Sequence, residues 1–186
     1  MSVFEEKYRL AMENNQPNVE AMVVCSIDSN NLMPHSRCVN LKYILNDELI
    51  FFSNYKSNKA IQFHNCKNVS CVFFWHTTNT QIRINGTIHK SNQEISDNHF
   101  LKRSIKKNAL AISSQQSKKV SSFDTIKRNY EKTLKSNKLS MRPSYWGGYS
   151  IKPNYFEFWQ GNENRLNLRE EYSMINAKWV YSILQP

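Results

Sequence analysis

The chain of 186 residues has only four glycines, and none belongs to a glycine-rich loop. Gly86 and Gly161 are isolated, and Gly147 and Gly148 form one pair. Loops that wrap a nucleotide phosphate need several closely spaced glycines, so the common nucleotide-binding loops are excluded. The motifs HExxH and CxxC are also absent, and the histidines lack ligand spacing, so the sequence predicts no metal site.

Long apolar runs are missing too, so we expect no segment that crosses a membrane. The first ten residues, MSVFEEKYRL, are acidic and amphipathic, whereas a secretory signal starts with positive charge and an apolar core. We therefore expect a cytoplasmic protein. The cysteines show neither the pairing of a zinc site nor the density of a disulfide scaffold, and we expect reduced thiols at Cys25, Cys38, Cys66 and Cys71.

A hydrophobic content of 40% is enough to bury one sizeable core, and no segment has the composition of a linker. We predict a single domain over residues 1–186. The formal net charge of +10 indicates anionic partners: nucleic acid, lipid headgroups or phosphorylated small molecules. Because the basic residues are scattered along the chain and form no single basic helix or tail, nucleic acid is the least favoured of these.

The hydrophobic pattern predicts a mainly β protein with flanking helices. Helical spacing favours a helix over residues 2–15, and alternation then favours about five strands, at 20–27, 36–44, 48–54, 68–76 and 80–90. Further helices are expected at 58–65, 92–103, around 109–112 and at 122–137, before strands at 145–151, 155–160, 164–172 and 178–184. Such a series of short antiparallel strands usually curls into a barrel or half-barrel.

The stretch FEFWQGNENRLNLR predicts two strands around a glycine turn. If the second strand includes Arg165, Asn167 and Arg169, alternation places all three on one face. Trp159, across the turn, would add a flat apolar surface, so the set suits a planar anionic ligand. The alternative is an ordinary half-buried strand whose polar side faces water.

His99, Arg103 and Lys107 follow one another at four-residue steps, which would place them on one face of a helix. Three cationic or titratable side chains repel each other unless an anion lies among them, so the spacing predicts a phosphate site. The alternative is a solvated basic face.

The segment QIRING would place Gln81, Arg83 and Asn85 on one face of a strand, where they could bind the edge of a heterocycle. Arg37 and Lys42 fall on opposite faces by simple alternation. They could serve one ligand only through a bulge, a strand end or different subunits, and spacing leaves these open.

Taken together, these blocks resemble the pyridoxine (pyridoxamine) 5′-phosphate oxidase family of FMN-dependent enzymes. The resemblance runs from AMVVCSID through RCVNLK, FFSNYKSNKA, FFWHTTNTQIRING, SSQQS and SYWGGY to EFWQG, NRLNLR and WVYSILQP. It implies an FMN-binding split β-barrel and a homodimer with the flavin at the subunit interface. It also implies that the flavin residues are Arg37, Cys38, Val39, Asn40, Leu41, Lys42, Phe52, Ser53, Asn58, Lys59, Gln81, Gln116, Ser117, Trp159 and Arg169.

The family pattern assigns the substrate phosphate to Lys42, Arg103 and two positions occupied here by His99 and Lys107, where the family has tyrosine and serine. It assigns the ring end of the substrate to Arg165, as the catalytic residue over the reacting carbon, and to Asn167, where the family has histidine. Asn58 also departs, because the family uses an arginine there to bind the flavin phosphate. We still expect bound FMN, because losing one charge-assisted hydrogen bond costs roughly ten- to hundredfold in affinity.

The resemblance implies an oxidase that converts pyridoxamine or pyridoxine 5′-phosphate to pyridoxal 5′-phosphate, with O2 as acceptor and H2O2 as product. The departures at His99, Lys107, Asn167 and Leu168 keep a second function open, an FMN oxidoreductase for another anionic aromatic, as in phenazine biosynthesis. A third is a protein that binds FMN or pyridoxal phosphate without turnover.

Overall fold

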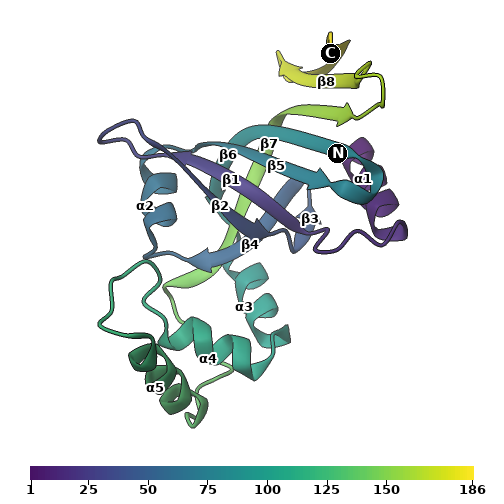
Figure 1. Ribbon diagram of the computed structural model, residues 1–186. Coiled ribbons are helices and arrows are strands. Elements are labelled where there is room, and N and C mark those ends of the chain that lie inside the picture. Colours follow the sequence, from purple (N-terminus) through teal and green to yellow (C-terminus); the bar gives the residue numbers. More distant parts are fainter.

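The computed structural model describes residues 1–186 and consists of one antiparallel sheet with helices around it (Figure 1). The strands are β1 (Ala21–Ile27), β2 (Pro34–Asn40), β3 (Tyr43–Leu45), β4 (Glu48–Asn54), β5 (Asn68–Trp75), β6 (Thr80–Lys90), β7 (Trp146–Gln160), β8 (Leu168–Ile175) and β9 (Lys178–Ile183). The helices are α1 (Ser2–Glu13), α2 (Asn58–Asn65), the 3-10 turn η1 (His76–Thr78), α3 (Gln93–Lys102), α4 (Ile105–Ser113) and α5 (Phe123–Leu134). The predicted mainly β class with flanking helices is confirmed.

The sheet has the strand order β2-β1-β5-β6-β7-β4-β3, with the hairpin β8–β9 attached to β7. Strand β7 changes its partner along its length: residues 146–151 pair with β4, and residues 155–160 pair with β8. Pro153, which lacks a backbone N–H, lies between the two paired segments. The curled sheet therefore divides at this point, and the hairpin leaves the barrel at the end opposite α3, α4 and α5 (Figure 1).

A register shift at Asn85 and Gly86 lets the neighbouring strand β6 follow the bend of β7. A Cβ atom on Gly86 would lie 2.4 Å from the carbonyl oxygen of Lys152, so only glycine fits at this close approach. We predicted two strands at 145–151 and 155–160, and this was wrong. One continuous strand spans both, because the bulge accommodates Pro153 without ending the strand.

Aromatic side chains fill the main core between the barrel and α1. Phe4 of α1 is fully buried, and its ring lies 5.4 Å from that of Phe73 and 6.2 Å from that of Phe156. Trp75 adds a fourth buried ring and donates its indole N–H to the carbonyl oxygen of Val19. Helix α1 therefore covers one end of the barrel (Figure 1).

Helices α3, α4 and α5 form a separate group below the barrel (Figure 1). Their small apolar cluster is made of Phe100, Ala111 and Trp146, and Trp146 is the first residue of β7. None of the helices in the structure is both long and apolar enough to cross a bilayer.

The tight turns use asparagine where many proteins use glycine. Asn46 and Asp47 join β3 to β4 with φ values of 51° and 61°, and Asn176 and Ala177 join β8 to β9 with 50° and 61°. These are left-handed conformations that asparagine tolerates better than most residues. No glycine of the chain has a positive φ, so the scarce glycines serve close packing and not turns.

Two other predicted strands differ from the structure. The segment 36–44 breaks after Asn40: Leu41 still donates its backbone N–H to Glu20, in register with β1, but Lys42 donates to Ile50 of β4. The segment 164–172 starts only at Leu168, for a reason given below.

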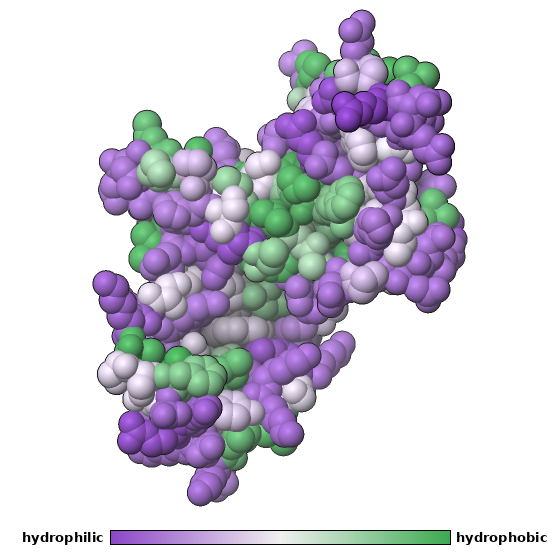
Figure 2. Space-filling view, viewed as in Figure 1, coloured by the Kyte–Doolittle hydropathy of each residue, from purple (hydrophilic) through white to green (hydrophobic).

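The outer face of the sheet carries an apolar patch, which Figure 2 shows as a green area over β1 and β5. Val23 is 38% exposed and Phe74 is 56% exposed, and Val72 lies beside Val23 in the pairing of these strands. Exposed apolar patches of this kind mark interfaces in many soluble proteins.

Candidate functional site

Two adjoining cavities lie between the barrel and the helices, and Lys59 lines both of them. The first, of about 490 Å³, is lined by residues of the β1–β2 turn, β2 and α2, together with Ser117. The second, of about 560 Å³, extends from β2 and β4 to α3 and α4. Predicted site residues in the first are Arg37, Asn58, Lys59 and Ser117, and in the second Cys38, Val39, Asn40, Lys42, Phe52, Ser53, Lys59, His99, Arg103, Lys107 and Gln116.

Arg37 is fixed in the first cavity by neutral partners. Its guanidinium donates to Ser26 Oγ at 2.6 Å and to Gln62 Oε1 at 2.7 Å, and Ser26 donates to the same Gln62 oxygen. No carboxylate pairs with Arg37, so its positive charge is available to an anion. Ser26 and Gln62 were not predicted, and their distance of 36 positions in sequence left no local signal.

Lys59 lies between the two cavities with only hydroxyl groups as partners. Its ammonium donates to Ser53 Oγ at 3.2 Å and to Ser57 Oγ at 3.4 Å. Burial and then the nearby Arg37 charge lower the pKa of Lys59 to about 8. A bound anion would relieve both effects, which is what a phosphate site requires.

The segment after α4 closes this region. Gln116 Oε1 accepts a hydrogen bond from Ser53 Oγ at 3.2 Å, and Ser117 Oγ accepts one from the backbone N–H of Asn58 at 3.4 Å. Ser117 has a φ of 74°, a strained left-handed conformation for a residue with a side chain. Such strain persists where the surroundings hold it, and it often occurs at ligand sites.

His99 belongs to an aromatic stack in the second cavity, with Phe52 as its central ring. Its ring lies 3.8 Å from Phe52 at 7°, and Trp146 continues the stack at 5.4 Å from Phe52. Nδ1 of His99 is 2.8 Å from the hydroxyl of Tyr43. If Tyr43 donates to Nδ1, the other nitrogen, Nε2, keeps the proton and can donate to a ligand.

The charge around His99 is strongly positive. Burial first, and then the charges of Arg103, Lys42, Lys102 and Lys107, lower the pKa of His99 to about 4. His99 is therefore a neutral hydrogen-bond donor at neutral pH, as the family tyrosine would be. Tyr43 and Trp146 were not predicted as site residues.

Arg103 packs on the Trp146 ring and has one guanidinium nitrogen without a hydrogen-bond partner. Its guanidinium lies 4.4 Å from the Trp146 ring and donates to the carbonyl oxygen of Lys107 at 3.1 Å. Its Nη1 atom is buried and has no hydrogen-bond partner. A buried guanidinium nitrogen without a partner is costly, so this atom indicates an anion site.

The helical-face argument for His99, Arg103 and Lys107 was wrong, although the three side chains do line one cavity. Helix α3 ends at Lys102, Arg103 is extended at φ −77° and ψ 152°, and Ser104 starts α4 by accepting the N–H of Lys107. The residues meet because the two helices turn at Arg103, and not because they share one helix.

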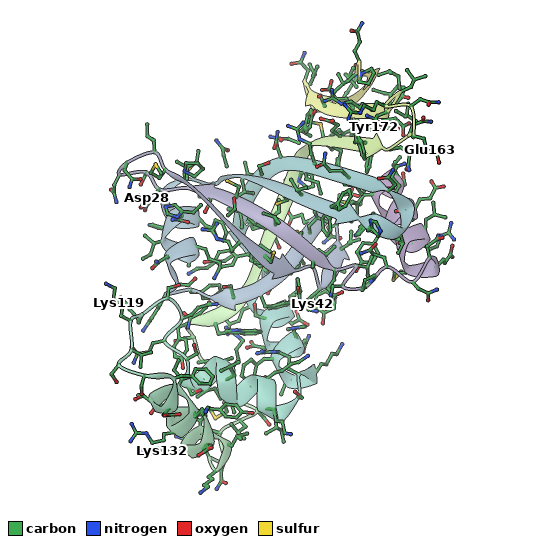
Figure 3. All side chains as sticks on the ribbon, viewed as in Figure 1. Asp28, Lys42, Lys119, Lys132, Glu163 and Tyr172 are labelled. Atoms are coloured by element: carbon green, nitrogen blue, oxygen red, sulfur yellow. The ribbon has the colours of Figure 1, made fainter.

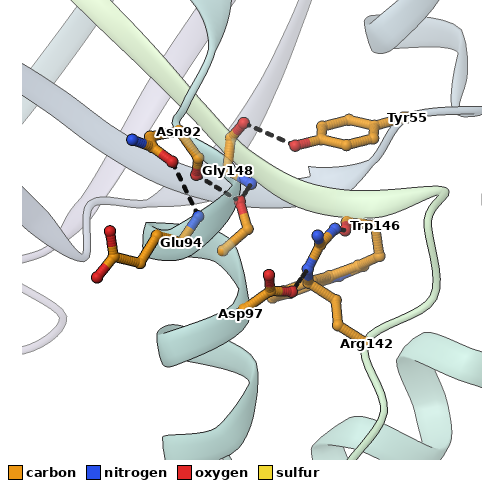
Figure 4. Close-up of polar contacts among 8 residues, drawn as sticks. Tyr55, Asn92, Glu94, Asp97, Arg142, Trp146 and Gly148 are labelled. Atoms are coloured by element: carbon orange, nitrogen blue, oxygen red, sulfur yellow. Dashed lines mark hydrogen bonds and ion pairs between the residues drawn. The ribbon is translucent and has the colours of Figure 1, made fainter.

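Hydrogen bonds hold α3 against the start of β7 (Figure 4). Arg142 donates to Asp97 at 2.6 Å and to the Trp146 carbonyl oxygen at 2.6 Å. Ser96 Oγ accepts from the backbone N–H of Gly148 at 3.0 Å. A Cβ atom on Gly147 would lie 2.2 Å from the Tyr55 hydroxyl oxygen, so glycine permits this contact. These bonds set the position of His99 relative to Trp146.

Arg37 and Lys42 reach adjoining cavities because β2 ends between them, at Asn40. The strand end, one of the three possibilities, therefore explains their placement. Lys42 also lies 3.7 Å from Glu20, an exposed ion pair of small energetic weight. Leu41, within the same predicted segment, is 5% exposed and belongs to the core, so only its backbone could reach a ligand.

A second group of predicted residues lies on β6, β7 and β8. Gln81 is paired with Trp159, and Trp159 with Arg169, so the three form one row across the sheet. Asn85 and Arg83 share the outer face of β6 with Gln81, while Ile82 and Ile84 are buried, as predicted.

Arg165 and Asn167 lie in the turn between β7 and β8, and their predicted place on a strand was wrong. Asparagine side chains close this turn: the N–H of Asn162 donates to Asn167 Oδ1, and the N–H of Asn164 donates to Asn162 Oδ1, both at 3.0 Å. Arg165 has a φ of 59°, and its guanidinium has no partner within the chain. Leu166 is 75% exposed and Leu168 is 48% exposed, so neither enters the core.

The two groups lie in different parts of one chain. Figure 3 shows Lys42 next to the helices and Glu163, in the turn that holds Arg165, beside the hairpin at the other end of the molecule. One chain by itself does not bring Arg165, Asn167, Trp159 and Arg169 to the two cavities. If all of them act on one ligand, two subunits must contribute.

The residues of the cavities fit the phosphate and the ring of FMN. The second cavity is lined by five cationic side chains and no carboxylate: Lys42, Lys59, Lys102, Arg103 and Lys107. The first offers Arg37 and the Ser117 hydroxyl, and Asn58 adds an amide. Phosphate oxygens accept from such donors, and the amide of Gln116 suits the edge of a flavin ring.

Two family models match nearly the whole chain. One, described as pyridoxamine 5′-phosphate oxidase, matches residues 10–136. The other, described as the C-terminal dimerisation region of pyridoxine 5′-phosphate oxidase, matches residues 146–186, which are β7, β8, β9 and the end of the chain.

Relatives and solved structures agree with these matches. The chain is 35% identical to a pyridoxine/pyridoxamine 5′-phosphate oxidase of Chromohalobacter salexigens over 191 residues, covering 100% of this chain and 88% of the relative. It is also 35% identical to the same-named protein of Legionella pneumophila strain Lens over 179 residues, covering 95% and 82%. The fold is similar to that of PhzG from Burkholderia lata 383, with a TM-score of 0.93, 22% identity, and coverage of 100% of this chain and 91% of that chain.

Proposed function

This chain belongs to the pyridoxamine 5′-phosphate oxidase family, and from that premise we propose that it oxidises pyridoxamine or pyridoxine 5′-phosphate to pyridoxal 5′-phosphate. The cofactor is FMN, O2 is the acceptor and H2O2 is formed; with the amine substrate, water also enters and the nitrogen leaves as ammonia. We also propose that residues 1–186 form a single domain that acts as a homodimer. When bound, FMN would supply the two-electron redox chemistry that the side chains of the chain lack.

The observation that carries this proposal is the unbalanced positive charge of the second cavity, with the unpartnered Nη1 atom of Arg103. In a phosphorylated substrate, the phosphate would accept from Arg103, Lys42 and Lys107. His99, held neutral, would add one N–H. This clamp fixes the substrate and leaves its ring free to lie against the flavin, where close approach lowers the barrier.

Arg165 would come from the partner's turn and lie over the reacting carbon. Its guanidinium, free of partners within its own chain, would orient the substrate's exocyclic oxygen or nitrogen and stabilise charge that develops there. The apolar patch at Val23, Val72 and Phe74 and the dimerisation region at 146–186 both support assembly with a second copy.

The proposal is tested by incubating the purified protein, loaded with FMN, with pyridoxamine 5′-phosphate in air. We expect the aldehyde and H2O2 to form in equal amounts, and no product without FMN. Protein that binds FMN but forms no aldehyde from either pyridoxamine or pyridoxine 5′-phosphate would contradict the proposed substrate.

A second candidate is an FMN oxidoreductase acting on another anionic aromatic. The observation that favours it is Asn167, whose side-chain oxygen already accepts a hydrogen bond from Asn162 at 3.0 Å. Asn167 cannot take up a proton at neutral pH as a histidine would, so the ring end of the site suits a substrate that needs no such proton transfer. Reduction of the bound flavin by such an aromatic, without reaction of the vitamers, would select this function. A protein that holds FMN or pyridoxal phosphate without turnover would reduce its flavin with neither.

The affinity for FMN is expected to fall as the pH rises above about 8, the pKa of Lys59 in the free protein. Lys59 is protonated below this pH, and bound phosphate raises its pKa further, so binding above pH 8 must take up a proton. The FMN phosphate is already a dianion above a pH of about 6, so it does not titrate in this range. We expect the dissociation constant to rise about tenfold between about pH 7.5 and 9.5, as measured by quenching of flavin fluorescence.

The matched control is Lys59→Arg, because an arginine stays charged throughout this range. The variant should show a dissociation constant that does not change over the same pH interval. An equal rise in both proteins would show that some other group titrates.

A further inference from the structure

Glu157 is a buried carboxylate on the outer face of β7, between Tyr155 and Trp159, which are half-buried. Its side chain is only 2% exposed, although Phe156 and Phe158 on either side of it are the residues that point into the core. A carboxylate on such a face is usually open to water. It is buried here because two arginine side chains cover it.

The carboxylate accepts hydrogen bonds at both oxygens. Oε1 accepts from Nε of Arg169 at 2.9 Å, and Nη2 of Arg169 lies at the same distance. Oε2 accepts from Nη1 of Arg83 at 2.8 Å and from the Tyr155 hydroxyl at 3.2 Å. Burial alone would raise the pKa of Glu157, but the Arg169 hydrogen bond and the Arg83 charge outweigh it and lower the pKa below its usual range. Glu157 is therefore ionised, and both of its oxygens accept hydrogen bonds.

Arg169 is held from two sides. Besides Glu157, the carbonyl oxygen of Gln185 accepts from Nη1 of Arg169 at 2.8 Å, close to the end of the chain. A guanidinium has five N–H donors, and these contacts occupy three of them. One N–H on Nη1 and one on Nη2 stay free for a ligand, and the remaining bonds fix the direction in which they point.

The neighbours of Arg169 show which side chains lie beside these free N–H groups. Trp159 is its partner across β7 and β8, and Gln81 is the next residue in the row, on β6. Glu157 lies two residues before Trp159 and therefore on the same face, next to this row. All three residues of the row are expected to contact the flavin.

We propose that Glu157 is a positioning residue for the flavin site: it holds Arg169 in line with Trp159 and Gln81 so that the two free N–H groups face the cofactor. The inference rests on the proposed binding of FMN. Glu157 accepts a hydrogen bond from Nε of Arg169 while the Gln185 carbonyl oxygen accepts one from Nη1, so the guanidinium is held at two of its nitrogens.

The test is a double-mutant cycle in the full-length protein, with the FMN dissociation constant as the readout. We expect Glu157→Gln to weaken FMN binding about tenfold and Arg169→Ala to weaken it about ten- to hundredfold. If Glu157 acts through Arg169, then Glu157→Gln should change FMN binding less than about twofold when Arg169 is already alanine. An equal loss in both backgrounds, or no loss in the wild-type background, would overturn the inference.

Glu171→Gln is the matched control, because Glu171 lies directly across from Glu157 on β8 but accepts no hydrogen bond from Arg169. It removes the same charge from the same face and should leave FMN affinity within about twofold of the wild type. If Glu157→Gln does not fold, Glu157→Asp keeps the charge but cannot reach Arg169 in the same geometry, and it should weaken FMN binding to the same degree. Tight FMN binding by that variant would also overturn the inference.

The two hypotheses fail differently. Wild-type protein that binds no FMN would overturn the proposed function and this inference with it. Wild-type protein that binds FMN, together with a Glu157→Gln variant of equal affinity, would overturn only the role of Glu157.

Discussion

Replacement of Arg165 by alanine is expected to leave FMN binding unchanged and to lower kcat for pyridoxamine 5′-phosphate by roughly 10²- to 10³-fold. The guanidinium of Arg165 has no partner within its chain, so its removal breaks no internal bond. Its proposed task is to stabilise charge that develops at the reacting end of the substrate. The measurement is steady-state oxidation at saturating substrate, with the flavin content determined from its absorbance.

The backbone of Arg165 offers a second variant. Its φ of 59° suits glycine better than any residue with a side chain, so Arg165→Gly removes the guanidinium and relaxes the turn. Both variants should therefore lose turnover to the same extent. Arg128→Ala, an exposed arginine on α5, is the control and should keep wild-type activity. Normal turnover in Arg165→Gly would contradict the role proposed for this residue.

Replacement of Arg103 by methionine is expected to raise KM for the phosphorylated substrate ten- to hundredfold with little change in kcat. A hydrogen bond to a charged group contributes about 1.5–3 kcal/mol, and Arg103 brings a buried nitrogen that has no other partner. Methionine keeps part of the contact with the Trp146 ring, so the loss reports mainly on the charge. The measurement is the dependence of initial rate on substrate concentration.

Lys106→Met is the control for Arg103→Met. Lys106 is exposed on α4 and lines neither cavity, yet its removal takes away the same charge from the same group of helices. KM should change by less than about twofold in this variant, because a distant exposed charge is screened by salt. A similar rise of KM in both variants would mean that the overall positive field, and not Arg103, binds the phosphate.

Many of the residues that line the two cavities were named from the sequence, because family blocks contain them, but the way in which they meet was not. The spacing of His99, Arg103 and Lys107 indicated an anion, and the cavity brings these residues together. They meet because the chain turns at Arg103 between α3 and α4, and a four-residue spacing does not indicate such a turn. Tyr43 and Trp146, which hold His99 and Arg103, come from β3 and β7 and carry no local sign of that role.

In the turn that carries Arg165, by contrast, the local pattern predicted the wrong structure. Alternation in RLNLR predicted a strand with both arginines on one face, because a two-residue period is a local property. The side-chain oxygens of Asn162 and Asn167 accept backbone N–H groups of the turn, and this delays the strand until Leu168. Local side-chain bonds overrode the hydrophobic period.

The mainly β class, the approximate places of most helices and strands, and the family could all be read from the sequence, because they depend on short-range periodicity and on conspicuous blocks of residues. The tertiary structure alone decided which cations converge without a carboxylate, where the sheet divides at Pro153, and how Glu157 becomes buried beneath two arginines. Each of these depends on contacts between residues far apart in the chain, and no local pattern encodes such contacts.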